Sequence, residues 1–217
     1  MGEAEINTTA QQIIIHSTIF IYGDAANAAL GVQIAKDISD HWNDANGKLM
    51  HKNRLYHVVF DIQGHWAENL TPEMVVENSN PRNNYFRVEA YAGMDISFVD
   101  GIGSNTGYFK LDNLLNNSTT AAHEYGHTIG LHHPPILDIR GKGRPGIMYP
   151  RGTIVDAFYQ YNPAAAPLEP GGTINPFTRK VLQDEIEKLR LQKLDFSSNG
   201  LAILGGFTSQ WHEKHLP

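Results

Sequence analysis

The pattern of hydrophobic and polar positions predicts a strand, a helix and a second strand in the first third of the chain. Residues 12–22 are rich in isoleucine and stop at a Gly-Asp pair, which is typical of a buried strand that ends in a turn. Residues 55–62 alternate in the way of another strand, and this order indicates a parallel crossover pair. Between them, residues 25–42 follow Asp24, a suitable N-cap, and repeat apolar side chains at helical spacing: Leu30, Ile34, Ile38 and Trp42.

Shorter elements are predicted in the middle of the chain. The polar stretch 67–82 predicts a loop with one short helical turn. Residues 85–91, 96–99 and 108–111 predict three further strands, the last of them at the sheet edge. Residues 100–107, DGIGSNTG, have the composition of a loop that connects two of these strands.

The last third of the chain predicts less regular structure. Residues 162–172 are rich in Pro, Ala and Gly and predict a surface loop or linker. Asn175 and Pro176 predict the start of an amphipathic helix that runs to about Leu194. From residue 195 onward we expect a solvated tail, with metal binding by two of its side chains as the weaker alternative: His212 and His215.

Composition and charge narrow the class of protein. The chain has 217 residues, of which 41% are hydrophobic and 18% charged, enough for one catalytic domain with a sizeable core. Its net charge of −6 includes no basic block, so we expect no nucleic-acid partner and a monomer in solution. No apolar run is long enough to span a membrane. There is no cysteine, so stability cannot rest on disulfides.

Residues 123–133 read HEYGHTIGLHH and carry the strongest chemical signal. Positions i and i+4 of a helix share one face, so His123 and His127 can present two ring nitrogens to one metal ion. We expect this helix to begin near Asn117 or Ser118, either of which can cap it. Five matched positions at the spacing HExxHxxGxxH arise by chance in about one chain in ten thousand, so a metal site is favoured over ordinary surface or core histidines.

The third metal ligand has to come from outside the helix, because a catalytic zinc keeps three protein ligands and one open position. Gly130 can take the left-handed conformation that ends a helix, which would return His133 to the metal. His132 and Asp138 are the alternatives for this role, and the spacing favours His133. Glu124 points to a different side of the helix, so we expect its carboxylate beside the metal as general base.

HExxHxxGxxH followed by a methionine turn resembles the metzincin clan of zinc endopeptidases. The candidate turn is residues 146–150, GIMYP, whose Met-Tyr-Pro order is similar to the matrixin version. The resemblance implies that Met148 lies under the three histidines as an apolar floor, whereas the alternative is an ordinary core methionine. In some metzincins a tyrosine two residues after the methionine approaches the metal. Here Tyr149 follows directly, so it is not expected to be a ligand.

The same resemblance implies a fold and an activity. The expected fold is α/β (α+β), with a mixed twisted sheet, an active-site helix and a small irregular carboxyl-terminal subdomain. In one domain, residues 12–133 would form the first subdomain, 134–194 the second, and 195–217 the tail. The implied activity is zinc-dependent hydrolysis of peptide bonds, with a protein or peptide substrate added as a strand along an edge within residues 96–109.

A second resemblance concerns the segment GIMYPRGTIVDAFYQYNP, which begins at Gly146. It is similar to metallopeptidase-like domains at the carboxyl ends of bacterial RHS/YD-repeat proteins. This implies a secreted or extracellular toxin or effector module released from a larger polypeptide. The first residues lack the pattern of a signal peptide, which also fits a mature form, an excised domain or a cytosolic protein. Alternative functions are a zinc-containing effector or binding module without general proteolysis, and a hydrolase of non-peptide amides.

A calcium site is a weaker possibility in the loop that precedes the histidine motif. Asp100, Asn105 and Asp112 supply oxygen atoms of the type that calcium binds. The same residue types are common in turns, where their side chains bond to nearby backbone. Turn chemistry is therefore the favoured interpretation of these residues.

Overall fold

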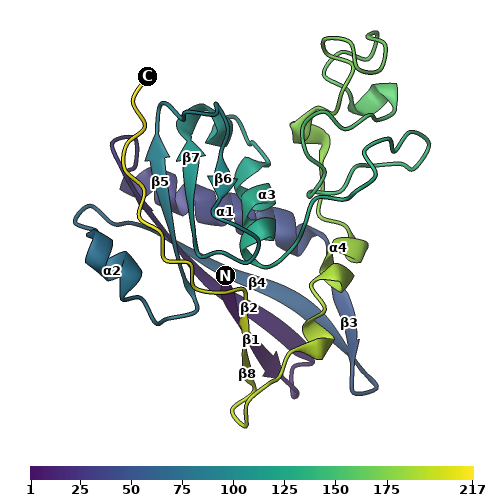
Figure 1. Cartoon of the computed structure of the whole chain (residues 1–217). Coiled ribbons are helices and arrows are strands. Elements are labelled where there is room, and N and C mark those ends of the chain that lie inside the picture. The colour runs from purple at the N-terminus through teal and green to yellow at the C-terminus, as the bar shows by residue number, and fades with distance from the viewer.

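The computed structural model describes residues 1–217 and shows a mixed α/β fold built on one curled sheet (Figure 1). Its main strand order is β3-β4-β2-β5-β7-β6, and β1 pairs with both β2 and β8. The predicted fold class is confirmed. The strands are β1 (Gly2–Asn7), β2 (Gln12–Tyr22), β3 (Lys48–His51), β4 (Arg54–Trp66), β5 (Asn83–Glu89), β6 (Phe98–Val99), β7 (Thr106–Lys110) and β8 (Leu201–Leu204).

The helices are short apart from the first one. The α-helices are α1 (Ala28–Asp44), α2 (Pro72–Val76), α3 (Thr120–Thr128) and α4 (Gln183–Lys188). The 3-10 helices are η1 (Leu111–Leu114), η2 (Ala157–Tyr159), η3 (Pro176–Thr178) and η4 (Leu191–Lys193). None of these helices combines the length and the apolar character needed to cross a membrane.

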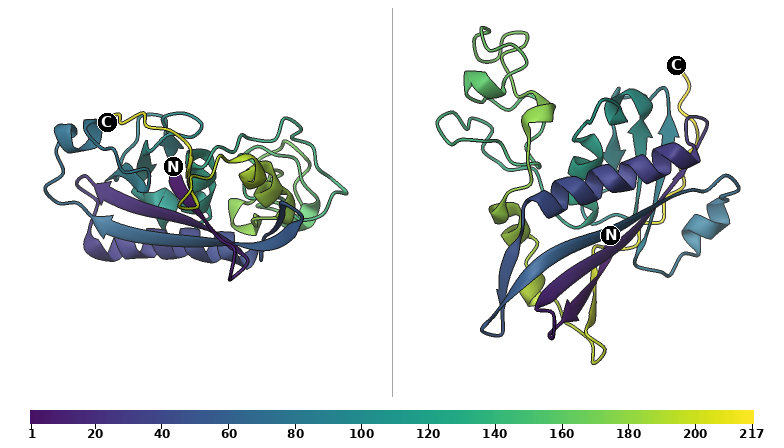
Figure 2. Two further views of the ribbon diagram at one scale, coloured as in Figure 1. Left: turned by 90° about the horizontal axis from the view of Figure 1, so that it is seen from below. Right: turned by 180° about the vertical axis from the view of Figure 1, so that it is seen from behind.

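The predicted parallel crossover is present, since β2 and β4 run parallel and α1 connects them through β3. The N-cap of α1 is Asn27 and not Asp24, because the Asn27 Oδ1 accepts a hydrogen bond from the backbone N of Leu30 at 2.9 Å. Helix α1 lies across one face of the sheet (Figure 2). A Cβ on Gly64 of β4 would lie 2.0 Å from the carbonyl oxygen of Gly31, so this close approach requires glycine.

The prediction that residues 108–111 form the sheet edge is wrong. Strand β7 lies between β5 and β6, because Phe98 and Val99 pair antiparallel with Tyr108 and Gly107. Strand β6 is therefore the edge, and its other side has no strand neighbour. This edge falls inside the stretch 96–109 in which a substrate-binding edge is expected.

The prediction of one long helix from Pro176 to Leu194 is also wrong. The segment forms η3, α4 and η4, separated by extended residues such as Leu182 and by Arg190, which has a left-handed backbone with φ 52°. Asn175 caps only the single turn of η3. The apolar residues of this segment belong to several short elements, each of which packs separately on the main core. Their spacing in the sequence therefore resembles that of a helix although no continuous helix forms.

The carboxyl-terminal residues are not a solvated tail. Strand β8 pairs with β1, and the chain then runs back along the sheet (Figure 1). Trp211 stacks on Tyr22 with ring centroids 4.6 Å apart, and His215 stacks on Tyr108 at 4.1 Å. Aromatic burial of this kind outweighs the polar composition that suggested a solvated end. His212 is buried too, and its Nε2 lies 2.8 Å from an Asp100 carboxylate oxygen; neither it nor His215 belongs to the group of residues that could hold a metal ion.

Candidate metal centre

Helix α3 is buried along its whole length and carries the first two histidines of the motif. It begins at Thr120, whose backbone N donates to the Ser118 Oγ at 3.1 Å. It ends just before Gly130, which has a left-handed φ of +100° as the sequence predicts. The backbone N of Leu131 bonds back to the Gly126 carbonyl at 2.9 Å. This tight turn reverses the chain and returns His133 towards the helix.

The turn brings together one ring nitrogen from each of three histidines. The Nε2 of His133 lies 3.0 Å from the Nε2 of His123 and 3.0 Å from the Nε2 of His127. One ligand atom from each ring lies within 4.8 Å of the other two, so the three can hold a metal ion. His123 and His127 are buried, whereas His133 is exposed, so the site opens to solvent on the side of His133.

Hydrogen bonds on the opposite ring nitrogens orient the two helical histidines. The Nδ1 of His123 lies 2.7 Å from the carbonyl oxygen of Ile147, and the Nδ1 of His127 lies 2.8 Å from that of Leu131. A carbonyl can only accept, so the Nδ1 of His127 carries the proton and its Nε2 keeps a lone pair. The Nδ1 of His123 carries the proton in the same way when it bonds to the Ile147 carbonyl and not to the Arg179 guanidinium, which lies 3.0 Å away. His133 Nε2 can donate to one of these lone pairs at most. A cation between the three nitrogens satisfies all of them.

The protonation states of the histidines also suit a metal ion. Burial lowers the pKa of His127 to about 4, although its bond to the Leu131 carbonyl raises that pKa in part. Burial also lowers the pKa of His123 well below its usual value, and the nearby Arg179 charge acts in the same direction. The pKa of His133 is lowered for the same reasons. Neutral imidazoles are the form that binds metal ions.

The two alternative third ligands lie elsewhere. His132 is exposed and does not belong to the group of converging nitrogens. Asp138 is exposed and its carboxylate accepts hydrogen bonds from the Arg140 guanidinium at 2.6 and 2.9 Å. His133 is therefore the residue that the chain path brings to the two helical histidines.

Glu124 lies in the wall of two cavities that adjoin the histidines, and its carboxylate has no hydrogen-bond partner in the protein. The side chain is buried, and this burial raises its pKa to about 8, while the charges of Arg179 and Arg151 act to lower that pKa. A buried carboxylate without a partner is costly unless it has a task or binds a cation nearby. Its position beside the histidines and its free oxygen atoms suit proton transfer.

Met148 packs directly against the middle of α3. A Cβ on Gly126, the neighbour of His127, would lie 2.2 Å from the Met148 sulfur, so the two segments touch where glycine leaves room. Met148 is 2% exposed and belongs to the main core. The buried Glu185 carboxylate holds this turn by accepting hydrogen bonds from the backbone N of Met148 at 2.8 Å and of Ile147 at 3.1 Å. The turn therefore supplies both the contact beneath the helix and the carbonyl that orients His123.

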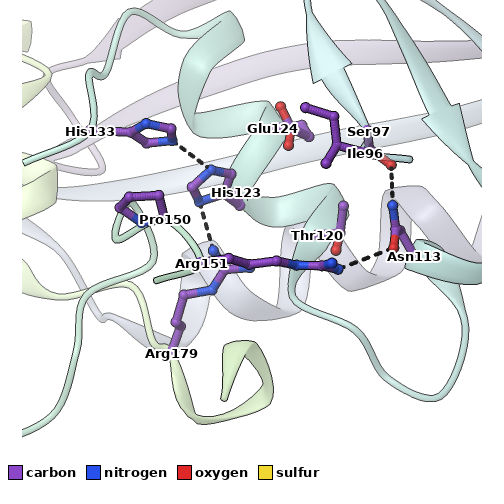
Figure 3. A pocket seen from close by; sticks show the side chains of 10 residues that line it. All are labelled: Ile96, Ser97, Asn113, Thr120, His123, Glu124, His133, Pro150, Arg151 and Arg179. Atoms are coloured by element: carbon purple, nitrogen blue, oxygen red, sulfur yellow. Dashed lines mark hydrogen bonds between the residues drawn. The ribbon is translucent and has the colours of Figure 1, made fainter. Parts of the chain in front are cut away.

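Three charged residues of the site are not identified by motif or spacing: Arg151, Arg179 and Glu185. Arg179 is buried and donates to the Tyr149 carbonyl at 2.9 Å and to the Thr119 hydroxyl at 2.8 Å. Its Nη1 also lies 3.0 Å from the Nδ1 of His123 (Figure 3). The sequence offered no usable signal for them, because Arg179 stands beside Lys180 and Glu185 beside Asp184 in a stretch of mixed charged and apolar residues.

The residues of the possible calcium site serve the packing of the last segment instead. The Asp100 carboxylate meets His212 at 2.8 Å and accepts from the Thr106 hydroxyl at 2.5 Å. The Asn105 Oδ1 accepts from the backbone N of Thr208 at 2.9 Å. Asp112 is exposed near Lys110. These oxygen atoms face different partners and do not converge on one point, and the long-range contacts of Asp100 and Asn105 replace the turn contacts that were the favoured interpretation.

Comparison with known proteins adds little to this geometry. No protein family matches the sequence, and no curated protein matches it. The solved structure of myroilysin is similar to this chain with a TM-score of 0.42 and 11% sequence identity, over 89% of this chain and 100% of that one. The chemistry of the site is therefore argued from the residues of this chain.

Proposed function

We propose that this protein is a zinc-dependent endopeptidase. The observation that carries the proposal is the convergence of three imidazole Nε2 atoms beside the unpartnered carboxylate of Glu124, at a wall shared with two open cavities. A closed structural site would have no use for a free carboxylate or for open space beside the ligands. Hydrolysis needs both, since a substrate must enter and a proton must be moved.

Zinc is the metal that fits this donor set best. Three neutral imidazoles with an open fourth position are typical of catalytic zinc, and zinc–nitrogen bonds of about 2.0–2.1 Å would place the nitrogens roughly 3.3 Å apart. The Nε2 separations of 3.0 Å are close to that spacing. When bound, zinc supplies Lewis-acid activation of water and of the scissile carbonyl.

Glu124 is the proposed general base and later the general acid. It takes a proton from the water molecule whose oxygen forms the new bond to the carbonyl carbon. It then delivers that proton to the amide nitrogen as the carbon–nitrogen bond breaks, so that the products are a carboxylate and an amine. Its place beside the histidines, in the wall of both cavities, suits both transfers.

The edge strand β6 is the proposed binding site for the peptide backbone. Phe98 and Val99 line a cavity of about 460 Å³ together with His123, Glu124 and His127. An unpaired strand edge offers hydrogen bonds to an extended peptide whatever its sequence. A peptide added to β6 would therefore pass the three histidines, which supports cleavage within a chain.

Substitution of Glu124 tests the proposal. The zinc-loaded protein and its Glu124→Ala variant are incubated with a diverse peptide library, the products are identified by mass spectrometry, and bound zinc is measured by elemental analysis. We expect cleavage by the parent only, with turnover reduced by about a hundredfold or more in the variant and one zinc bound by both. The conservative Glu124→Gln variant separates the loss of the base from the loss of packing.

Other results would contradict the proposal in different ways. Near-parental cleavage by Glu124→Ala would remove Glu124 from the mechanism. Loss of zinc from that variant would make Glu124 part of the metal site. If the parent protein binds one zinc but cleaves no peptide, the result would favour an effector with a single protein target or a binding module.

A further inference from the structure

The cavity beside Glu124 and His133 is polar and has an unusual charge. It measures about 230 Å³, and Ile96 is the only large aliphatic residue in its wall. Arg151 and Arg179 line it together with Ser97, Asn113 and Thr120 (Figure 3). Two guanidinium groups thus face a space whose only carboxylate is that of Glu124. The whole chain has a net charge of −6, so this local excess of positive charge runs against the overall balance.

Neither guanidinium has a carboxylate partner in the protein. The Nη2 of Arg179 bonds only to the Thr119 hydroxyl, and no acidic side chain lies within ion-pair distance of this buried group. Arg151 is exposed, and its one hydrogen bond joins its Nη2 to the Asn113 Oδ1 at 3.1 Å. Both arginines therefore retain N–H groups that no protein atom accepts.

We infer that this cavity binds a carboxylate of the substrate next to the scissile bond, an inference that rests on the proposed peptidase activity. An arginine binds a carboxylate through paired, charge-assisted hydrogen bonds. A lysine side chain would meet two positive groups at close range, and an apolar side chain would cover them without supplying an acceptor. A glutamate or aspartate side chain fits, and so does the α-carboxylate at a peptide's carboxyl terminus.

Matched peptides distinguish these two sources. One series carries Glu, Gln, Leu or Lys on either side of the cleaved bond, with an amidated carboxyl terminus. A second series places the same bond one residue from a free or an amidated carboxyl terminus. A side-chain preference predicts about tenfold higher kcat/KM for Glu than for Gln in the amidated peptides. A terminal preference predicts instead that amidation alone lowers kcat/KM by about tenfold.

Arg151 is the position to change, because it is exposed and its replacement leaves the core intact. We expect Arg151→Gln to reduce the preference for the carboxylate to less than about threefold, and Arg151→Glu to favour Lys over Glu. Arg54→Gln is the matched control, since Arg54 is exposed on β4 and lines neither cavity. It should keep the parental preference. Zinc content and circular dichroism verify that each variant is folded.

A binding measurement separates this inference from the proposed function. Fluorescence anisotropy of labelled Glu and Gln peptides on the Glu124→Gln protein, with and without Arg151→Gln, needs no turnover. Cleavage without a preference for a carboxylate overturns the inference and leaves the endopeptidase intact. Absence of cleavage, combined with tighter binding of the Glu peptide that Arg151→Gln abolishes, supports the cavity assignment and contradicts the peptidase. Absence of both cleavage and selective binding overturns the inference.

Discussion

Residues 1–133 and residues 134–196 are held in place by different interactions. The first region is a sheet with α1 and α3 packed against it, and most of its backbone hydrogen bonds lie within helices and strands. The second region has no strand and only short helices; its first part extends away from the sheet, whereas α4 and η4 lie beside β3 (Figure 1). Its own core is small and consists of three buried residues: Ile139, Val155 and Ile174. In the first region, side chains buried at regular intervals along strands and helices determine the structure. In the second region, the structure depends on individual contacts between side chains and backbone.

Buried charged side chains take over the role of regular structure in the second region. Glu185 accepts hydrogen bonds from the backbone N of Ile147, Met148 and Leu182, and Arg179 donates to the carbonyls of Tyr149 and Pro176. Each of these side chains fixes segments that are distant in sequence. One substitution in this region can therefore release several backbone groups at once.

The largest effect is expected from breaking the main core, to which residues of both regions contribute. Trp42 is fully buried, packs against the tilted ring of Phe60 with centroids 4.9 Å apart, and donates from Nε1 to the Ala122 carbonyl at 3.0 Å. Trp42→Ala should lower the free energy of unfolding by about 4 kcal/mol, measured by urea denaturation. The loss should be global, so hydrogen exchange accelerates in the strands and in residues 134–196 alike. Faster exchange confined to α1 would contradict a core shared by both regions.

A smaller and more local effect is expected from Glu185→Ala. The substitution leaves two buried and one half-buried backbone N–H group without an acceptor, which should cost about 3 kcal/mol. Hydrogen exchange should speed up in residues 134–196 while the sheet keeps its protection. Because the Ile147 carbonyl orients His123, zinc affinity should also fall by about tenfold or more, as chelator competition would measure.

Glu187→Ala is the matched control for this position. Glu187 is exposed two residues further on and bonds only to the Gln183 side chain. It should leave both zinc affinity and exchange unchanged. Equal effects of the two substitutions would mean that α4 as a helix, and not the Glu185 carboxylate, holds the turn.

The smallest effect is expected at the contact between the two regions. Gly126→Ala improves helix propensity in α3 but places a Cβ against the Met148 sulfur and against Trp42. Overpacking should exceed the gain, for a net loss of about 1 kcal/mol in the urea experiment. The double variant Gly126→Ala with Met148→Ala should recover part of this loss, because the added methyl group then has space. A gain in stability from Gly126→Ala alone would show that Met148 can move aside.

The difference between the regions also explains what could be predicted from the sequence. Alternation and helical spacing identified β2, α1 and β4, because burial on one face leaves a period in the sequence. The spacing of the histidine motif predicted the left-handed Gly130, since local geometry alone decides it. The same reasoning failed for residues 176–194, whose apolar side chains reach the core from separate short pieces.

The second group of missed features depends on long-range contacts. Arg179 and Glu185 meet the turn at residues 146–150 through contacts that span 30 and 37 positions, and no short pattern records such contacts. The buried end of the chain was missed for the same reason, because Trp211 and His215 stack on rings of β2 and β7. The candidate metal ligands could therefore be identified from one short stretch of sequence. The residues that hold them in place could not, because they lie far away in the chain.

The bond between the His123 ring and the Ile147 carbonyl determines when, during synthesis of the chain, the three-histidine centre is complete. During synthesis α3 leaves the ribosome before Ile147, and well before the arginine and glutamate that hold the turn in place. A nascent chain that has exposed all three histidines still lacks the carbonyl that orients the first of them. We expect the three-histidine centre to be complete only after about fifty further residues have emerged and folded.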